Sequence, residues 1–344
     1  MPSGAETLAR PWGQGAPAVT FAPDVDVESR GEIESVLRDW EPALFPGGDL
    51  EISNLVGGAS NRNFVVRTPA AKYALRIANA QSERFAVDRV AAHRAQREAA
   101  AAGLAPEPLA ARLPEGHVLS RFVEGPTLGG GTLRAPGVLE TVGSTLRQLH
   151  ALPSALPVYS PFEDIRLWSR LAREDGTEIP TELEDLFEQA WKIEALVDAA
   201  ELPTVFCHND PWTENFILSG SRLQLVDWDY AGRGWACFEL GSFCATAGLG
   251  SEERGALVRA YDADTSEAQL ATVELMEFVA AMREATWAVM ATPILRGTMT
   301  PVDGDDFYDN HLRTFLSLAR KRAGEANFGR LTEVASDRSK PRTW

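Results

Sequence analysis

The chain has 344 residues, 44% of them hydrophobic, which is typical of a globular protein with room for two lobes around separate cores. Its 33 Lys and Arg against 49 Asp and Glu give a net charge of −16, which opposes nucleic-acid binding and suits either a cationic small molecule or a merely solvated acidic surface. Three cysteines without paired spacing exclude a disulfide framework, and no apolar run reaches the length of a membrane span. Because no basic start precedes an apolar segment, we expect a cytoplasmic protein.

The first part of the chain predicts a small β-rich lobe. Residues 1–25 are rich in Gly, Pro and Ala without periodicity and predict a flexible leader. Apolar spacing predicts a helix over residues 32–40, and an Ala-rich, charged segment predicts a second helix over 85–102 with Ser82 as its N-cap. Alternating branched or aromatic residues predict strands at 50–55, 63–68, 72–77 and 117–125, of which the second and third form an antiparallel pair.

The rest of the chain is mostly helical in pattern. The composition turns helical from about residue 135, with a long acidic stretch over 183–199 and amphipathic segments over 252–318. Short apolar strands are predicted only at 204–207, 215–218 and 223–226. The sequence therefore predicts an α+β, bilobal fold with a small antiparallel β-sheet N-lobe and a mostly helical C-lobe. We place the N-lobe at 26–123, the C-lobe at 124–330 and a polar tail at 331–344.

One segment carries the strongest chemical signal. In VFCHNDPWTENFI, the residues His208, Asp210 and Asn215 have the H-x-D-x-x-x-x-N spacing of a kinase catalytic loop, and Asp227 follows after the apolar strand LQLV. A lone Asp or Asn more often caps a turn, but the ordered set between strands favours catalysis. Asp210 is then the catalytic carboxylate that accepts the proton of an attacking hydroxyl, and Asn215 and Asp227 are hard oxygen ligands for Mg²⁺. We expect His208 to orient this loop through hydrogen bonds.

These residues carry a family resemblance. FCHNDPWTENFIL and LQLVDWDYAG resemble the choline/ethanolamine kinases and related aminoglycoside phosphotransferase-like enzymes, including bacterial thiamine kinase relatives. LVGGASNRNFVVRT is similar to the phosphate loop of that family and VLSRFVEGPTL to its hinge, so the likeness spans residues 50–320. It implies a protein kinase-like fold that binds ATP and Mg²⁺ between its lobes and phosphorylates a hydroxyl group.

The resemblance also implies a nucleotide site. Glycines at the phosphate loop let the backbone approach phosphates, although a plain hairpin turn has the same composition. Arg76 lies where kinases place a cation against the phosphates. Its usual partner is a helix acid, but Ala92 occupies the expected position, which leaves Asp88 or Glu98. The nucleotide residues implied are Gly57, Gly58, Ser60, Asn61 and Arg76, with the linker residues Arg121, Phe122 and Val123 beside the adenine.

The acceptor side is less defined by sequence. Asp229 is a candidate for assisting the metal or contacting the acceptor, and Glu239 matches a family acid that steadies this region. Trp212 and Trp287 are candidate walls for an ammonium group, although tryptophans are also common in cores. We therefore expect a cationic small-molecule acceptor such as choline or ethanolamine, with an aminoglycoside, thiamine or another metabolite as the alternative. A non-catalytic nucleotide-binding regulatory protein is disfavoured because Asp210, Asn215 and Asp227 are all present.

Overall fold

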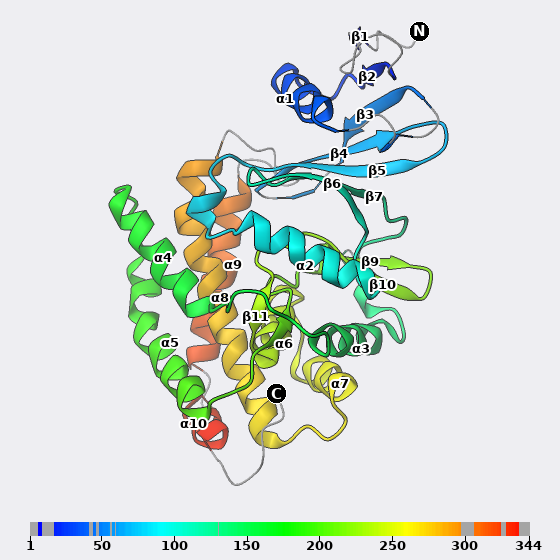
Figure 1. The fold of residues 1–344 in the computed structure, drawn as a ribbon. Coiled ribbons are helices and arrows are strands. Elements are labelled where there is room, and N and C mark those ends of the chain that lie inside the picture. The colour runs from blue at the N-terminus through cyan, green and yellow to red at the C-terminus, as the bar shows by residue number, and fades with distance from the viewer. Residues whose placement is uncertain are drawn as a thin grey trace.

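The computed structural model describes residues 6–8, 17–40, 44–45, 48–55, 57–58, 60–129, 131–296, 306–324 and 328–336. An N-terminal sheet lies above a mostly helical C-terminal part (Figure 1). The buried hydrophobic side chains form one cluster in each part. The α+β fold class predicted from the sequence, with an antiparallel N-terminal sheet and a helical remainder, is confirmed.

The N-terminal sheet has the strand order β1-β2-β3-β4-β5-β7-β6 within the described residues. All neighbouring strands are antiparallel except β2 and β3, and the predicted β4–β5 pair is confirmed, with Phe64 opposite Leu75. The sequence analysis assigned residues 19–21 to a leader, but they form β2, whose Val19 and Phe21 are fully buried. A three-residue strand is too short to show alternation. The strands are β1 (Glu6–Leu8), β2 (Val19–Phe21), β3 (Leu50–Asn54), β4 (Arg62–Arg67), β5 (Lys72–Ile77), β6 (Pro108–Arg112) and β7 (His117–Arg121).

Both helices of the N-lobe begin at an aspartate cap that the sequence analysis missed. Helix α1 (Val27–Arg38) starts five residues before the predicted position because the Asp26 side chain accepts a hydrogen bond from the Ser29 amide. Helix α2 (Arg89–Ala101) is capped by Asp88, whereas the predicted cap Ser82 belongs to a separate 3₁₀ turn, η2 (Ser82–Phe85). The predicted starts were wrong because the first turn of α1 is polar and the chain turns between Phe85 and Asp88.

The C-lobe is built around α8 (Glu267–Leu295), which packs against α4, α5, α6, α9 and α10. This helix is apolar and buried on all sides, so the charged pair Arg283–Glu284 on it requires buried partners. Helix α10 also covers residues 331–336 of the segment predicted as a polar tail. The other helices are α3 (Val138–His150), α4 (Pro161–Glu174), α5 (Thr181–Ala200), α6 (Ala236–Thr246), α7 (Ser251–Tyr261), α9 (Phe307–Gly324) and α10 (Phe328–Ser336).

Two short antiparallel strand pairs lie below the N-terminal sheet and hold the polar loops. Strand β8 (Val205–Cys207) pairs with β11 (Gly232–Gly234), and β9 (Phe216–Ser219) pairs with β10 (Arg222–Leu225). The strands predicted at 204–207, 215–218 and 223–226 are thus confirmed to within one residue. No helix in the described part of the chain is long and apolar enough to cross a membrane.

Candidate active site

The loop after β8 is fixed from below by a buried glutamate. One carboxylate oxygen of Glu239, on α6, accepts the backbone N–H groups of His208 and Asn209, both at 2.8 Å, and its other oxygen pairs with His150 Nε2. Burial opposes ionisation of Glu239, but the hydrogen bond and charge of His150 outweigh it and hold the pKa of Glu239 below its ordinary value. Because this acid is charged and fully engaged, it sets the backbone that presents Asp210.

His208 ties the same loop to the end of β10. Its Nε2–H donates to the Val226 carbonyl at 2.9 Å, and its ring packs on Trp228 with centroids 4.8 Å apart. The side chain is fully buried, and burial lowers the pKa of His208. His208 does not line the cavity that lies between the two lobes. Its position is therefore that of a residue that orients the loop.

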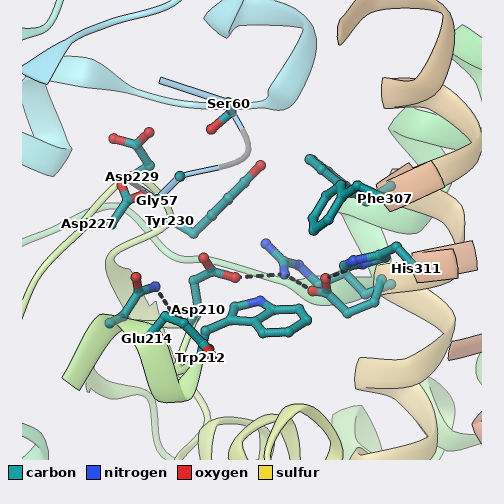
Figure 2. Close-up of a pocket in the computed structure, with 15 residues that line it drawn as sticks. Gly57, Ser60, Asp210, Trp212, Glu214, Asp227, Asp229, Tyr230, Phe307 and His311 are labelled. Carbon is teal, nitrogen blue, oxygen red and sulfur yellow. Dashed lines mark hydrogen bonds and ion pairs between the residues drawn. The ribbon is translucent and has the colours of Figure 1, made fainter. Parts of the chain in front are cut away.

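A cavity of about 480 Å³ lies between the two lobes. Figure 2 shows Asp227 and Asp229 beside Gly57 on one side of it, with Ser60 above them and Asp210 below them. Gly57 and Ser60 belong to the loop between β3 and β4. Residues that are more than 150 positions apart in the sequence thus meet here. Its lining includes the sequence-predicted residues Gly57, Gly58, Ser60, Asp210, Trp212, Asn215, Asp227, Asp229 and Trp287.

Electrostatics at Asp210 and Asp227 favour a bound cation. Burial, followed by the charges of Glu284 and Asp227, raises the pKa of Asp210, although Arg283 Nη1 lies 3.3 Å from its Oδ1. Burial and the Asp229 charge likewise raise the pKa of Asp227, which still has 32% of its side chain exposed. Neighbouring carboxyls whose ionisation is opposed are stabilised as anions when a cation binds between them.

The residues predicted to hold Mg²⁺ suit that ion. The Asn215 side-chain amide donates to the Asp210 carbonyl at 3.0 Å, which orients Asn215 beside Asp227 at the cavity wall. Amide and carboxylate oxygens are the hard ligands that Mg²⁺ prefers. Asp227 has a φ of +62°, a conformation that only a few residue types adopt readily, so the chain is turned sharply at this carboxylate.

The ion-pair partner of Arg76 corrects the sequence analysis. Arg76 Nη1 lies 2.7 Å from Asp229 Oδ1 and 3.4 Å from Asp227 Oδ1. The two predicted partners are wrong, because Glu98 pairs with Arg94 and Asp88 caps α2. Asp229, in the loop after β10, takes the place of the acid expected on helix α2. Because Arg76 and Asp229 are 153 residues apart, the local sequence gives no signal for this pair.

A buried network surrounds Asp229. Its Oδ2 accepts hydrogen bonds from Arg89 Nη1 at 2.6 Å and from the Asn61 amide at 2.9 Å. The Asn61 side-chain oxygen in turn accepts from Arg89 Nη2 and from the Asn79 backbone, each at 3.2 Å. Asn61, predicted to contact nucleotide, and Asp229, predicted to contact metal or acceptor, are thus engaged within the protein. The network joins the loop between β3 and β4 to the C-lobe, and Arg89 was not predicted from the sequence.

Replacing Asp229 with asparagine should lower the free energy of unfolding at pH 7 by about 3 kcal/mol, because Arg76 and Arg89 lose a buried counter-charge. Burial raises the pKa of Asp229, but the two arginines outweigh this and lower it to about 2. This depressed pKa gives stability that is present above about pH 4 and is lost as the pH falls towards 2. Urea unfolding at pH 7 and pH 3 should therefore show a difference between wild type and variant that shrinks at the lower pH.

The matched control for this prediction is Glu107→Gln. Glu107 pairs with Arg121, and both side chains are largely exposed, so its loss should change stability by less than about 1 kcal/mol. Equal effects of the two substitutions would contradict the structural role assigned to Asp229.

The predicted linker residues lie at the end of β7. Arg121 is exposed, and the Phe122 amide donates to the Lys72 carbonyl at 3.4 Å, while the Lys72 ammonium lies 5.7 Å from the Phe122 ring centre. Arg121, Phe122 and Val123 are not part of the cavity lining. Their contact with an adenine remains a prediction.

A row of charged side chains lies at the cavity away from the predicted metal ligands Asn215 and Asp227. Arg283 Nη1 contacts Asp210 Oδ1 at 3.3 Å and Glu284 Oε1 at 2.6 Å, and Glu284 Oε2 contacts His311 Nε2 at 3.0 Å. Asp164 balances the Arg283 guanidinium from below at 3.0 Å. Trp212 and Trp287 were predicted from the sequence, but six other lining residues were missed. These are Glu214, Tyr230, Arg283, Glu284, Phe307 and His311.

Comparison with known proteins decides the family. The sequence profile of the phosphotransferase enzyme family matches residues 51–272, more than half of the chain. This chain belongs to that phosphotransferase family. The resemblance inferred from the catalytic loop is therefore confirmed.

Individual members of the family are similar to this chain. Protein LicA of Haemophilus influenzae is 27% identical over 222 residues, which cover 62% of this chain and 63% of LicA. A choline/ethanolamine kinase family protein from Mesorhizobium loti has a TM-score of 0.71 at 23% identity, covering 89% of this chain and 99% of that one. Choline kinase LicA from Streptococcus pneumoniae has a TM-score of 0.68 at 18% identity, covering 84% and 99%. At these identities the two structures establish the kinase-like fold.

Some of the residues that line the cavity lie inside the segment matched by the family profile and others lie beyond it. Asp210, Asn215 and Asp227 lie inside the matched segment 51–272. Glu284, Trp287 and His311, on the far wall, lie beyond it on α8 and α9. This far wall is thus built from a part of the chain that the shared family pattern does not describe.

Proposed function

We propose that this chain is an ATP- and Mg²⁺-dependent kinase that transfers the γ-phosphate to a hydroxyl of an amino alcohol such as choline or ethanolamine. The observation that carries the proposal is that one cavity is lined both by Asp210, Asn215 and Asp227 and by Gly57, Gly58 and Ser60 of the predicted phosphate loop. The same cavity is also lined by Trp212, Trp287 and acidic groups.

Each catalytic group has a role that its position supports. Asp210 orients the acceptor hydroxyl and takes its proton, since it lines the cavity between the metal ligands and the far wall. Asn215 and Asp227 would hold Mg²⁺, which when bound neutralises phosphate charge during transfer. Gly57 and Gly58, with φ of +122° and +93°, adopt a conformation that glycine favours and that lets backbone N–H groups approach phosphates.

The charges of the far wall support a cationic acceptor. Arg283 contacts three acidic side chains, those of Asp164, Asp210 and Glu284, so acidic groups outnumber the guanidinium on this wall. Aromatic rings of Trp212 and Trp287 lie beside these acids and attract ammonium groups. The names of the similar structures, a choline kinase and a choline/ethanolamine kinase family protein, point to the same class of acceptor.

An ATP-consumption screen of the purified protein tests this proposal. The panel holds amino alcohols, vitamins, sugars and aminoglycosides, each assayed with and without Mg²⁺. We expect the highest kcat/KM for an amino alcohol and no turnover without the metal. A neutral sugar or an aminoglycoside as the best substrate would reject the amino alcohol while leaving the kinase assignment in place.

Trp287→Leu should raise the KM of the acceptor about tenfold and leave the KM of ATP unchanged, because leucine keeps apolar bulk but lacks the negative ring face. Trp287 is 8% exposed, lines the cavity and also packs on Phe85 and Tyr308. Steady-state kinetics with both substrates varied, together with the melting temperature, separate a binding role from a packing role. Trp191→Leu, which alters a tryptophan stacked on Phe187 far from the cavity lining, is the control.

A loss confined to the melting temperature of Trp287→Leu, with both KM values unchanged, would contradict the proposed wall.

A further inference from the structure

The aromatic rings expected to surround a substrate cation are in contact with a side chain of the protein itself. His311, on α9, lies with its ring centre 5.5 Å from that of Trp212, 5.2 Å from that of Trp287 and 5.7 Å from that of Phe307. Figure 2 shows His311 beside Phe307 at the wall of the cavity opposite Asp227 and Asp229. A quaternary ammonium group binds best when several open aromatic faces enclose it. Here those faces partly enclose an imidazole ring.

The hydrogen on His311 can be assigned from its partner. Burial opposes ionisation of Glu284, but the hydrogen bond from His311 and the charge of Arg283 outweigh it and lower the pKa of Glu284. As a carboxylate, Glu284 can only accept hydrogen bonds, so His311 Nε2, 3.0 Å from Glu284 Oε2, carries a hydrogen. In the neutral imidazole the other nitrogen, Nδ1, is then an acceptor.

The Nδ1 atom of His311 is available to accept a hydrogen bond from a ligand. Within the described residues it has no hydrogen-bond partner, and His311 lines the cavity. The wall also connects to the catalytic carboxylate, because Glu284 joins His311 to Arg283 and Arg283 joins Glu284 to Asp210. A short acceptor that presents its hydroxyl to Asp210 therefore extends its other end along this row.

We propose that His311 is a specificity-determining residue, which makes the site select amino alcohols whose nitrogen carries at least one N–H over those with a quaternary nitrogen. This inference rests on the proposed amino-alcohol kinase function and deepens it. An N–H group donates to Nδ1, whereas a trimethylammonium group cannot, and it leaves this acceptor nitrogen dehydrated and unpaired. Sites built to hydrogen-bond a substrate discriminate strongly against analogues that lack the donor.

A methylation series of one acceptor tests the inference. Ethanolamine, its N-methyl and N,N-dimethyl derivatives and choline share the reacting hydroxyl, and the last methylation removes the last N–H. For the full chain at pH 8 we expect kcat/KM to fall at least about tenfold between the dimethyl compound and choline. His311→Phe keeps an aromatic ring but has no acceptor nitrogen. In this variant the kcat/KM values for the dimethyl compound and choline should differ by less than about threefold.

Phe315→Leu is the matched control. Phe315 packs on His311 with ring centres 4.7 Å apart but does not line the cavity, so its loss loosens the packing of His311 without removing Nδ1. The dimethyl-to-choline ratio should be unchanged in this variant. If the ratio of the kcat/KM values for the dimethyl compound and choline falls equally in Phe315→Leu and His311→Phe, the role proposed for Nδ1 is wrong.

Calorimetric titration of the same four amines into the protein with Mg²⁺ and a non-hydrolysable ATP analogue separates the two proposals. If choline binds and reacts as well as the dimethyl compound, the role of His311 is wrong and the amino-alcohol kinase stands. If none of the four binds or reacts, the amino-alcohol function and the specificity inference both fail.

Discussion

Replacing Asp210 with alanine is expected to lower kcat by a factor of about a hundred or more while ATP binding stays nearly intact. A positioned carboxylate acts on the acceptor hydroxyl in the transfer step, so its loss affects turnover rather than nucleotide affinity. Arg283 keeps Asp164 and Glu284 as partners when Asp210 is removed, so the fold around the site should persist. Steady-state kinetics and a nucleotide titration measure the two effects.

Two further variants sharpen this experiment. Asp210→Asn keeps the shape of the side chain and should be nearly as inactive, because the amide cannot take the proton. Asp198→Ala removes an exposed acid from the last turn of α5, far from the cavity lining, and should retain wild-type turnover. If Asp210→Ala kept wild-type turnover, Asp210 would not be the catalytic carboxylate.

Replacing Asp227 with alanine should weaken Mg²⁺-dependent nucleotide binding by at least about a hundredfold. The substitution removes the charged side chain that would hold Mg²⁺ at the nucleotide, and even the loss of a residue that only supports a metal ligand lowers metal affinity by up to about that factor. The experiment is a nucleotide titration at several Mg²⁺ concentrations. The wild type should show affinity that rises with Mg²⁺, and the variant should show affinity that hardly responds to it.

The backbone at Asp227 requires a second variant. Its φ of +62° is one that asparagine adopts more readily than alanine, so Asp227→Ala combines the loss of a ligand with backbone strain. Asp227→Asn removes the charge while keeping the local conformation, and its melting temperature should stay closer to that of the wild type. Unchanged Mg²⁺ dependence in the asparagine variant would show that Asp227 does not hold the metal.

Local chemistry explains what could be predicted from the sequence. The spacing of His208, Asp210 and Asn215, and the strand before Asp227, lie within 20 residues of one another, so the loop and its flanking strands could be placed from the segment alone. The β4–β5 pair was equally local, because its alternating residues are joined by a short turn. Helix starts were less predictable, since the caps Asp26 and Asp88 precede polar first turns that carry no apolar periodicity.

The sequence by itself determined the family, the α+β fold class and the identity of the residues predicted to act on the phosphate. Only the tertiary structure decided their partners. Arg76 pairs with Asp229 across 153 positions, and Glu284 pairs with His311 between helices α8 and α9. A buried charge takes whichever opposite charge the packed chain brings within reach, and distance along the sequence does not constrain that choice. The residues predicted to react could therefore be identified from local spacing, whereas the network around Asp229 and the cavity wall around His311 arise from packing.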